Sequence, residues 1–381
     1  MKIRMAMIGG GTGSFIGPVH RIAATMDGQM ELTAGAFSSN PDVSAETGKE
    51  LGLDPGRVYS RWEDMITRES KLPPHLRPHV ISIVTPNWLH YKPAAMALDA
   101  GFHVICDKPL SMSLDEALDI ESKVNKSGLL FCVTHNYTGY PMVKKARQLV
   151  AEGALGEIRK VATEYFQGWL STRVEDSGNR QAVWRADPAK AGIAGCMADI
   201  GTHAFNLAEY ITGLQVSSLF ASLDRTVSGR VLDDNGSVIL DFNGGVKGSL
   251  LASQVATGEE NNLRIKIYGS LGGLEWEQMN PNNLLVRWPD RPYEVYRTAS
   301  GYFPNGSPAS LHSRLPAGHP EGFIEAFANL YRNFALAIRA HEEGKRPDIS
   351  YDFPGIIAGV RGMRFLESAV ISSETGSWVS L

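Results

Sequence analysis

The feature that most constrains this chain is an alternation of short apolar runs with helix-like stretches over roughly its first 135 residues. Runs that are apolar throughout suit strands buried on both faces of a parallel sheet. Helix-like stretches lie between them, for example residues 91–100, which are followed by Gly101 as a helix with a C′ glycine should be. The alternation predicts a doubly wound parallel sheet, with strands at residues 4–9, 31–37, 80–85, 103–106 and 129–134.

The pattern changes after about residue 156, where strand-like segments of alternating polarity follow one another with few helices. It predicts an α+β domain with a large, open, meander-like antiparallel sheet, covered on one face and available for oligomerisation on the other. Near the end, apolar residues at helical spacing predict an amphipathic core helix over residues 320–341. We therefore expect a dinucleotide-binding domain at residues 1–135 and a substrate-binding and oligomerisation domain at residues 136–381. The strand-like segments are residues 158–166, 237–242, 246–253, 263–268, 273–277 and 284–288, and the helix residues are Phe323, Phe327, Leu330, Tyr331, Phe334 and Ile338.

The composition limits the classes of binding partner and of site that we expect. Lys and Arg number 37 against 41 Asp and Glu, a net charge of −4 without blocks of one sign, which argues against nucleic acid or a membrane surface as a partner. Cys106, Cys132 and Cys196 form no Cys-x-x-Cys pair, so neither a disulfide framework nor a metal site is expected. No secretion signal or long apolar stretch is apparent, so we expect a cytoplasmic protein.

A glycine-rich segment follows the first predicted strand. The dinucleotide fingerprint G-x-G-x-x-G places its third glycine three positions after its second, yet Gly17 lies six positions after Gly11. Taken alone, the segment is as compatible with an ordinary turn as with a cofactor loop. If Gly9, Gly11 and Gly17 are the fingerprint glycines, three residues are inserted, Gly17 allows close packing of the helix, and the inserted bulge meets the pyrophosphate. Its expected donors are Thr12, Gly13 and Ser14.

The end of the second strand bears on the choice between NAD and NADP. An Asp or Glu usually binds the adenosine ribose there, but this chain has Ser38, Ser39 and Asn40 after Phe37. The missing carboxylate permits a 2′-phosphate, whereas no adjacent cation would bind one strongly. Both cofactors stay open with a slight preference for NAD, and an ordinary polar turn explains Ser39 and Asn40 equally well.

Two further strand ends carry polar groups that should meet at the same edge of the sheet. One is the segment from Thr85 to His90, and the other is Asp107-Lys108-Pro109. Near the positive nicotinamide the pKa of Lys108 should fall, which would suit it to accept a proton from a substrate hydroxyl. The structural alternative is a solvated loop lysine.

A second chemical constellation lies in the later half of the chain. Asp199 and His203 are four residues apart on a helix-like stretch, so that a carboxylate could orient an imidazole that relays a proton. The alternative, equally compatible with the residues, is an amphipathic helix with a wet face that Asp199 caps.

Together these pieces resemble the Gfo/Idh/MocA family, the NAD(P)-dependent sugar and polyol dehydrogenases that include glucose-fructose oxidoreductase and inositol dehydrogenase. The resemblance runs over almost the whole chain. Its motifs are the glycine loop with His20, Thr85-Pro-Asn-x-x-His90, residues 100–109, Asn136-Tyr137 with Pro141, residues 152–156, Trp184-Arg185, Asp199-Ile-Gly-Thr-His203 and residues 372–379.

The resemblance implies a Rossmann domain, a C-terminal α/β domain with a large open sheet, and a site at their junction. It implies that Lys108, Asp199 and His203 are catalytic and that these three residues and Tyr137 bind the substrate. Asp107 stands where the family has Glu, and residues 192–195 depart from the usual glycine-rich lead into the helix. The cofactor-binding residues that we expect are Gly9, Gly11, Thr12, Gly13, Ser14, Phe15, Ile16, Ser38, Ser39, Thr85, Pro86, Asn87, His90, Asp107, Lys108, Asn136, Trp184 and Arg185.

The expected activity is hydride transfer from a secondary hydroxyl of a cyclic sugar or inositol-like polyol to NAD or NADP. One alternative is an NAD-dependent glycosidase that oxidises a sugar transiently, eliminates the aglycone and re-reduces the ring, with Tyr137 or Tyr302 assisting. Another is a cofactor-sensing binding protein, which would need neither Lys108 nor the Asp199/His203 pair. The family also implies a homodimer or homotetramer formed through the C-terminal sheet.

Overall fold

A computed structural model describes residues 2–381 of the chain, with the exception of the side chain of Arg180. The chain forms two compact units. The first comprises the residues up to Asn136 together with Phe323–Val360, and the second comprises Tyr137–Gly322 and Arg361–Leu381. The segment Phe323–Val360 thus lies with the N-terminal sheet, although the expected boundaries assigned everything after residue 135 to one C-terminal domain.

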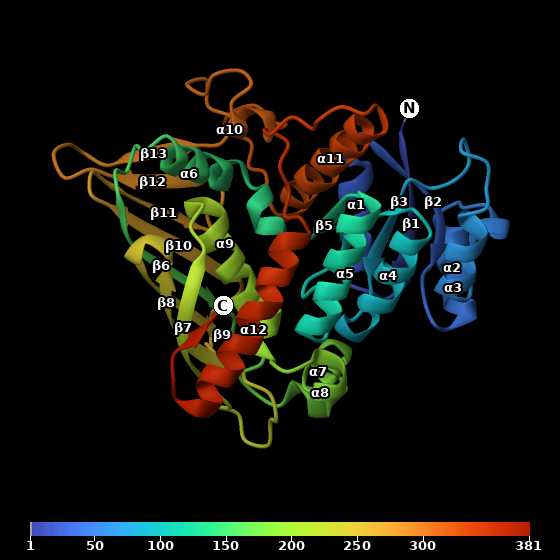
Figure 1. The fold of residues 1–381 in the computed structure, drawn as a ribbon, viewed down its shortest axis with the longest axis horizontal. Helices are drawn as coiled ribbons and strands as arrows, with labels where there is room; N and C mark the ends of the chain where they lie inside the picture. The colour runs from blue at the N-terminus through green and yellow to red at the C-terminus, as the bar shows by residue number, and fades with distance from the viewer. Residues whose placement is uncertain (1) are drawn as a thin grey trace. The chain divides into compact units, whose positions relative to one another are not determined.

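The first unit is built on a parallel five-stranded sheet with the order β2-β1-β3-β4-β5 (Figure 1). Strands β1, β3, β4 and β5 are almost fully buried, as expected for a sheet with helices on both faces, whereas the edge strand β2 is partly exposed. The doubly wound fold class predicted from the sequence is confirmed. The strands are β1 (Ile3–Gly9), β2 (Met30–Ala36), β3 (Val80–Val84), β4 (His103–Cys106) and β5 (Phe131–Val133), and the helices are α1 (Ile16–Met26), α2 (Pro41–Glu50), α3 (Trp62–Glu69), α4 (Tyr91–Asp99), α5 (Leu114–Ser127) and α11 (Phe323–Glu342).

Helix α11 belongs to this unit because its apolar face packs against the sheet beside α1. Phe327, Tyr331 and Phe334 share one buried core with Met5 and Met7 of β1. The amphipathic helix predicted near the end of the chain is therefore confirmed. Its partner, strand β1, lies more than 300 residues away in the sequence.

The strand order creates a topological switch point between β1 and β3, whose following segments leave in opposite directions from adjacent strands. Gly9 at the end of β1 pairs with Val84 at the end of β3. Open α/β sheets bind their ligands at the carboxyl ends of strands at such a point. The glycine loop and the segment starting at Thr85 thus lie side by side at this edge.

The second unit is built on a nine-stranded sheet with the order β13-β12-β11-β10-β6-β9-β8-β7-β14. Strand β6 pairs antiparallel with β10 but parallel with β9, so the expectation of a simple meander is wrong in this detail. Two meanders, β7–β9 and β10–β13, flank the first strand of the unit instead. The strands are β6 (Ile158–Phe166), β7 (Val216–Asp224), β8 (Asn235–Phe242), β9 (Lys247–Ser253), β10 (Asn262–Gly269), β11 (Gly273–Glu277), β12 (Asn283–Arg287), β13 (Glu294–Arg297) and β14 (Val379–Ser380).

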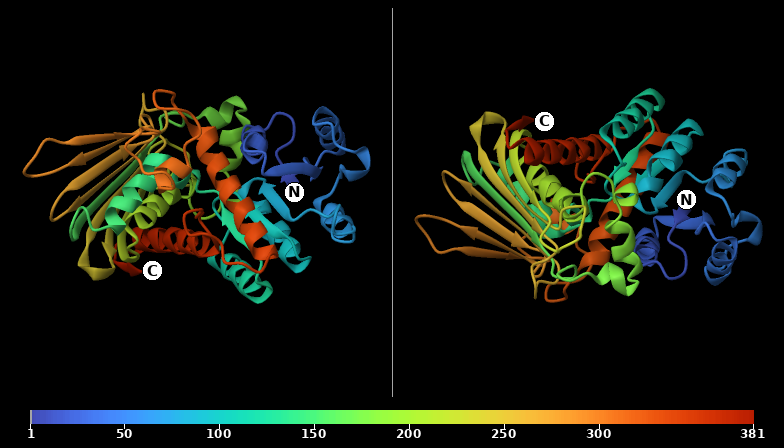
Figure 2. Two further views of the ribbon diagram at one scale, coloured as in Figure 1. Left: turned by 90° about the horizontal axis from the view of Figure 1, so that it is seen from above. Right: turned by 90° about the horizontal axis from the view of Figure 1, so that it is seen from below.

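Helices α6 (Pro141–Ala151) and α9 (Thr202–Thr212) cover one face of this sheet, and its other face is open (Figure 2). Burial alternates along β8, as an antiparallel strand with one covered face requires. The predicted large, open, mostly antiparallel sheet is confirmed. The other helices are α7 (Arg180–Arg185), α8 (Pro188–Ala191), α10 (Pro308–Leu311) and α12 (Ile356–Thr375), and a π-helical turn spans Met197–Gly201 directly before α9.

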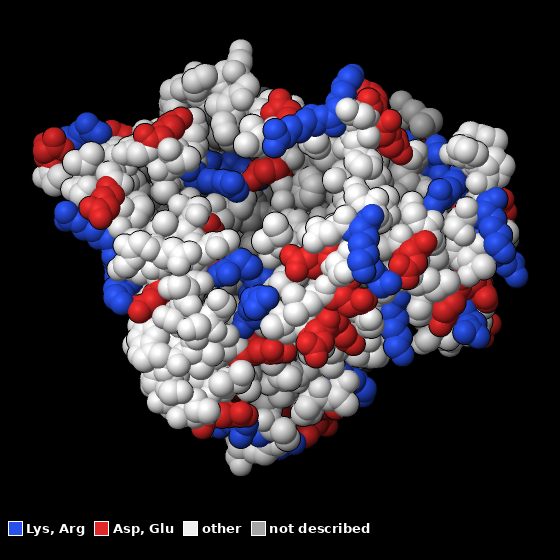
Figure 3. All heavy atoms as spheres, in the orientation of Figure 1, with Lys and Arg blue, Asp and Glu red and all other residues white. Residues whose placement is uncertain are grey.

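Basic and acidic side chains are interspersed over the face of the molecule shown in Figure 3. On the open face of the large sheet they form ion pairs, for example between Arg264 and Glu277 (2.6 Å) and between Arg287 and Glu275 (2.8 Å). Among residues 2–381, none of the helices combines the length and the apolar character that crossing a bilayer requires.

Candidate functional site

The glycine loop between β1 and α1 is tightly packed by the protein's own backbone. Gly9 and Gly10 have positive φ angles of 84° and 73°, which favour glycine. A Cβ atom at Gly17 would lie 2.3 Å from the carbonyl oxygen of Gly10, and one at Gly11 would lie 2.9 Å from that of Phe37. Glycine is thus required where the helix meets the loop, in agreement with the packing role expected for Gly17.

The donors of the loop are partly engaged within the chain. The N–H of Thr12 donates to Thr47 Oγ1 at 3.0 Å, and its hydroxyl donates to Glu50 Oε2 at 3.0 Å. Ser14 Oγ accepts from the N–H of Gly17 at 2.9 Å. The N–H of Gly13 has no partner among the described residues, and Gly13 is exposed with a φ angle of 83°. Of the three expected donors, Gly13 is therefore the one best placed to meet a ligand.

The segment after β2 keeps both of its interpretations. The side chain of Asn40 caps α2 by accepting from the N–H of Asp42 at 3.0 Å, and Ser38 Oγ accepts from the N–H of Asn40 at 3.1 Å. Ser39 is exposed. Asn40 thus fulfils the structural role that the sequence left open.

Asp107 follows β4 and is turned into the first unit. Its Oδ1 lies 3.1 Å from His20 Nε2 and accepts from the hydroxyl of Thr134, which follows β5. Burial alone would raise the pKa of this carboxyl group, but the charge and hydrogen bond of His20 and the hydrogen bond from Thr134 lower it. Asp107 is therefore an ionised anchor within the fold, and the contact with the cofactor that the family resemblance implies stays a prediction.

His90 braces the two strand-end segments against each other. Its Nδ1 lies 2.7 Å from the carbonyl oxygen of Pro109, and its Nε2 lies 2.8 Å from that of Thr85. The imidazole is fully buried, and burial lowers its pKa although the charge of Asp107 opposes this. His90 therefore contacts backbone on both sides, and its contact with the cofactor stays a prediction.

Lys108 lies between Asp107 and Pro109 in the sequence. Burial is the main reason why the pKa of His135 falls to about 3, and the charge of Lys108 lowers it further. His135 is therefore neutral at ordinary pH. The backbone on either side of Lys108 is fixed through Asp107 and Pro109.

The first unit fits a dinucleotide. Positive-φ glycines and the N-terminus of α1 lie at the switch point, where backbone N–H groups and the helix dipole favour a pyrophosphate. Asn136, after β5, is 2% exposed, and its Nδ2 has no hydrogen-bond partner among residues 2–381. A buried donor of this kind favours a bound acceptor, because leaving it unpaired costs about 1–3 kcal/mol.

In the second unit, Asp199 lies in the π-helical turn before α9. Its Oδ2 accepts from Arg185 Nε at 3.0 Å and from Gln254 Nε2 at 2.9 Å. The guanidinium of Arg185 also stacks on Trp184, 4.2 Å from the ring centre. Arg185 is thus a partner of the expected catalytic carboxylate, and its expected contact with the cofactor stays a prediction. Asp199 is not the N-cap of α9.

His203 lies in the first turn of α9, about one helical turn after Asp199. Its ring meets that of Tyr137 edge to face at 4.9 Å and that of Tyr165 at 6.2 Å. The hydroxyls of Tyr137 and Tyr165 lie 2.5 Å apart. Burial raises the pKa of both phenols, so they act as neutral hydrogen-bonding groups.

Side-chain hydrogen bonds connect Asp199 with the two tyrosines through amide side chains. Together with His203, whose ring packs against the tyrosines, these residues form what we call the polar wall. Gln254 donates to Gln167 at 3.2 Å, Gln167 donates to Asn261 at 2.8 Å, and Asn261 donates to Tyr137 at 3.1 Å. The sequence analysis missed Gln167, Gln254, Asn261 and Tyr165, which come from the ends of β6, β9 and β10. Only the position of each at or near a strand end hinted at a role. The polar wall consists of Tyr137, Tyr165, Gln167, Asp199, His203, Gln254 and Asn261.

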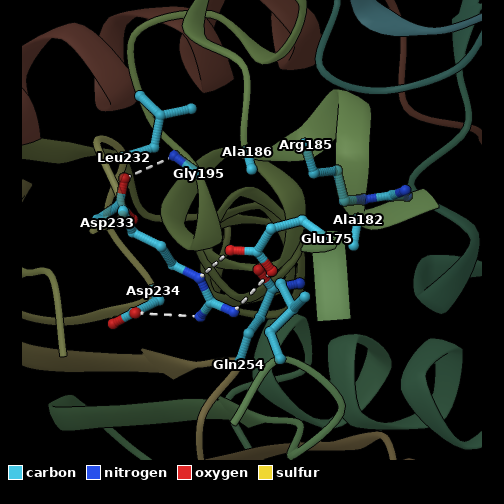
Figure 4. A pocket seen from close by; sticks show the side chains of 11 residues that line it. Glu175, Ala182, Arg185, Ala186, Gly195, Leu232, Asp233, Asp234 and Gln254 are labelled. Atoms are coloured by element: carbon cyan, nitrogen blue, oxygen red, sulfur yellow. Dashed lines mark hydrogen bonds and ion pairs between the residues drawn. The ribbon is translucent and has the colours of Figure 1, made fainter. Parts of the chain in front are cut away.

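A small cavity lies beside Arg185 and Gln254, between the loop before α7 and the start of the π-helical turn (Figure 4). Arg230 lines the cavity and pairs with Glu175 and with Asp234, each at 3.1 Å. The cavity has a volume of about 30 Å³, which is enough for water and not for a sugar. The buried ion pairs therefore serve the structure around Asp199, and the cavity is not a substrate pocket.

Comparison with known proteins gives consistent matches over the chain. Residues 3–146 match the family described as "Oxidoreductase family, NAD-binding Rossmann fold", and residues 143–275 match the "GFO/IDH/MocA C-terminal domain". An uncharacterized oxidoreductase of Bacillus subtilis, YfiI, is 34% identical over 99% of this chain and 96% of its own length. Levoglucosan dehydrogenase of Pseudarthrobacter phenanthrenivorans is 27% identical over 75% of this chain and 76% of its own.

Among solved structures, an inositol dehydrogenase homologue of Azotobacter vinelandii is similar in both sequence and fold. Its complex with NAD⁺ covers 100% of this chain and 98% of its own, at 36% identity and a TM-score of 0.94. Its complex with NADH and myo-inositol has the same coverage, 35% identity and a TM-score of 0.91.

Proposed function

Because this chain belongs to the Gfo/Idh/MocA family of oxidoreductases, with an NAD-binding Rossmann domain at its N-terminus, we propose that it oxidises a secondary hydroxyl of an uncharged, inositol-like cyclic polyol. The resemblance found in the sequence is confirmed. The observation that carries the substrate class is the polar wall, in which carboxylate, amide, phenol and imidazole groups alternate as donors and acceptors. Such an array suits a ring that carries several hydroxyls.

The charge of the polar wall favours a neutral substrate. Arg185 supplies the positive charge next to Asp199, and the two side chains form an ion pair at 3.0 Å. A phosphate group would have to compete with Asp199 for that guanidinium. A sugar phosphate is therefore a poorer candidate than a free polyol.

The cofactor is NAD in this proposal, held by the glycine loop with Gly13, by Thr85, Pro86 and Asn87, and by Asn136. When bound, it supplies an acceptor for the hydride of the substrate. The segment Phe37–Asn40 contains no Lys or Arg that would bind the 2′-phosphate of NADP. We expect catalytic efficiency with NAD to exceed that with NADP.

The chain's own residues handle the proton. Lys108 Nζ accepts the proton of the reacting hydroxyl, and the imidazole of His203 relays it, with the negative charge of Asp199 stabilising the imidazolium form. The neutral phenols of Tyr137 and Tyr165 hold the substrate's other hydroxyls. Their raised pKa disfavours a phenolate base, which the glycosidase alternative would use.

The test combines NAD or NADP with myo-inositol, free sugars, sugar phosphates and an aryl glycoside, and follows reduced cofactor and released phenol separately. We expect reduced NAD with an uncharged polyol, and loss of that signal in Lys108→Ala. Phenol release without net reduced cofactor would establish the glycosidase instead. If no substrate responds and Lys108→Ala behaves as wild type, the proposal is wrong.

We also propose that the open face of the large sheet forms a homodimer or homotetramer. Ile239, Leu251 and Tyr268 are exposed on its strands by 51%, 37% and 43%. Exposed apolar side chains on a sheet face favour association. Sedimentation should detect a dimer or tetramer that Ile239→Lys weakens, and a monomeric wild type would contradict this.

A further inference from the structure

A buried row of hydrogen bonds runs through the first unit beneath the segment that carries Lys108. The hydroxyl of Ser82 in β3 lies 2.9 Å from that of Tyr331 in α11, and the Tyr331 hydroxyl lies 2.7 Å from His20 Nδ1 in α1. His20 Nε2 lies 3.1 Å from Asp107 Oδ1. Ser82, Tyr331 and His20 have no exposed surface.

The chemistry of the last member fixes the direction of the whole row. An ionised carboxylate only accepts hydrogen bonds, so the proton between His20 and Asp107 belongs to Nε2. Near pH 8, where an ordinary imidazole is uncharged, Nδ1 is then the acceptor, and the Tyr331 hydroxyl donates to it. The oxygen of Tyr331 in turn accepts from Ser82, so that each donor in the row has one acceptor.

The row ends at the residue before Lys108. Thr134 holds Asp107 from the other side, and the N–H of Asp107 donates to the carbonyl of Ile83 at 3.0 Å. A shift of the Asp107 carboxylate would therefore move the backbone from which Lys108 extends. Small displacements of a catalytic group are costly, because its efficiency depends on geometry.

We propose that Tyr331 is a positioning residue: by donating to His20 Nδ1 it holds the imidazole in the Nε2–H tautomer, which orients Asp107 and with it Lys108. The inference rests on the proposed function for the role of Lys108, whereas the tautomer itself does not depend on any activity. A helix from the far end of the chain thus supports the cofactor-binding half of the site. His20 acts here by donating a hydrogen bond and not by passing a proton on.

The direct test is ¹⁵N NMR of the protein labelled at histidine, recorded near pH 8, where an ordinary imidazole is uncharged. His20→Gln identifies the His20 signals among those of the 10 histidines. We expect a protonated Nε2 and an unprotonated Nδ1 in the wild type, and exchange with the other tautomer in Tyr331→Phe. A protonated Nδ1 in the wild type, or an unchanged tautomer in Tyr331→Phe, would overturn the proposal.

Kinetics separates positioning from a merely structural role. Loss of the support for Asp107, directly in His20→Ala and through His20 in Tyr331→Phe, should lower kcat about 10- to 100-fold, with little change in KM for the polyol. His20→Gln keeps an N–H for Asp107 and should restore most of the kcat lost in His20→Ala. Equal losses in His20→Gln and His20→Ala would contradict orientation and indicate proton transfer.

The matched control removes another buried tyrosine hydroxyl of the same unit. Tyr59 donates to Glu69 Oε1 at 2.8 Å, and neither residue contacts the row. Tyr59→Phe should leave kcat and the His20 tautomer unchanged, and a loss of kcat equal to that of Tyr331→Phe would count against the proposal. A wild type without dehydrogenase activity but with the expected tautomer would refute the proposed function and leave the orientation of Asp107 standing.

Discussion

The two units hold their functional side chains in different ways. In the first, the imidazole of His90 lies against the backbone carbonyls of Thr85 and Pro109, and the loop glycines contact backbone atoms directly. In the second, the polar wall is joined by bonds between side chains, such as those from Gln254 to Asp199 and from Gln167 to Asn261. The first arrangement allows few substitutions without loss of stability, whereas the second can change its binding preference one side chain at a time.

The largest expected effect tests the chemistry of the polar wall. His203→Asn should lower kcat about 10²- to 10⁴-fold, the range for loss of a general acid or base. NAD affinity, measured by titration calorimetry, should stay within a few-fold of wild type because the cofactor residues lie in the first unit. A kcat within about threefold of wild type would remove His203 from the catalytic group.

The next effect is a difference in acid stability: we expect low pH to destabilise the first unit before the second. The pKa of His79 and of His103 is lowered to about 4 and that of His135 to about 3, in each case chiefly by burial, from an ordinary value of 6.5. The unfolded chain therefore binds more protons below about pH 6.5, so stability that is complete above that pH is lost as pH falls towards 4. The slope is at most about 1.4 kcal/mol per pH unit for each histidine.

Hydrogen exchange resolved by segment measures this at about pH 5 and about pH 7.5. His79 directly precedes β3, and His103 begins β4. We therefore expect these two strands to lose protection before the strands of the large sheet do. His103→Gln, whose amide oxygen could still accept from the N–H of Leu130 as Nδ1 does at 3.0 Å, should lessen the difference. Earlier opening of the large sheet would contradict the prediction.

Gly17→Ala tests the backbone packing of the glycine loop. The added Cβ would lie 2.3 Å from the Gly10 carbonyl oxygen, so we expect about 1–3 kcal/mol lower free energy of unfolding, together with weaker NAD binding. Gly355→Ala is the control in the same unit, because its Cβ would meet its nearest atom at an ordinary 3.7 Å. Denaturant unfolding compares the two variants, and equal stability would show that the loop is not tightly packed.

The smallest expected effect is on substrate affinity. Gln254→Ala removes one neutral donor from Asp199 and should raise KM for the polyol about 3- to 10-fold, with NAD affinity unchanged. Gln148→Ala is the control, since within residues 2–381 its side chain bonds to Glu152 and Lys145 and not to the polar wall. A change in NAD affinity in Gln254→Ala, without a change in KM, would reverse the assignment of the polar wall.

The same difference explains what the sequence could predict. Strands β1–β5 were predictable because buried parallel strands are apolar throughout, and the positions of Lys108 and Thr85 followed from their places at strand ends. The polar wall was not predictable, because Gln167, Gln254 and Asn261 are common polar residues that only the pairing of β6 with β9 and β10 brings together. The anchoring of Asp107 by His20 likewise depends on the packing of α1, which no local pattern reveals.

The central claim, that an uncharged polyol gives up hydride to NAD, is tested most directly with myo-inositol deuterated at every ring carbon. After one incubation with NAD, mass spectrometry should find deuterium in the nicotinamide of reduced NAD and an equal amount of a ketone. Reduced NAD that carries no deuterium, or an NAD pool that shows no net reduction with any uncharged polyol tested in this way, would contradict the account.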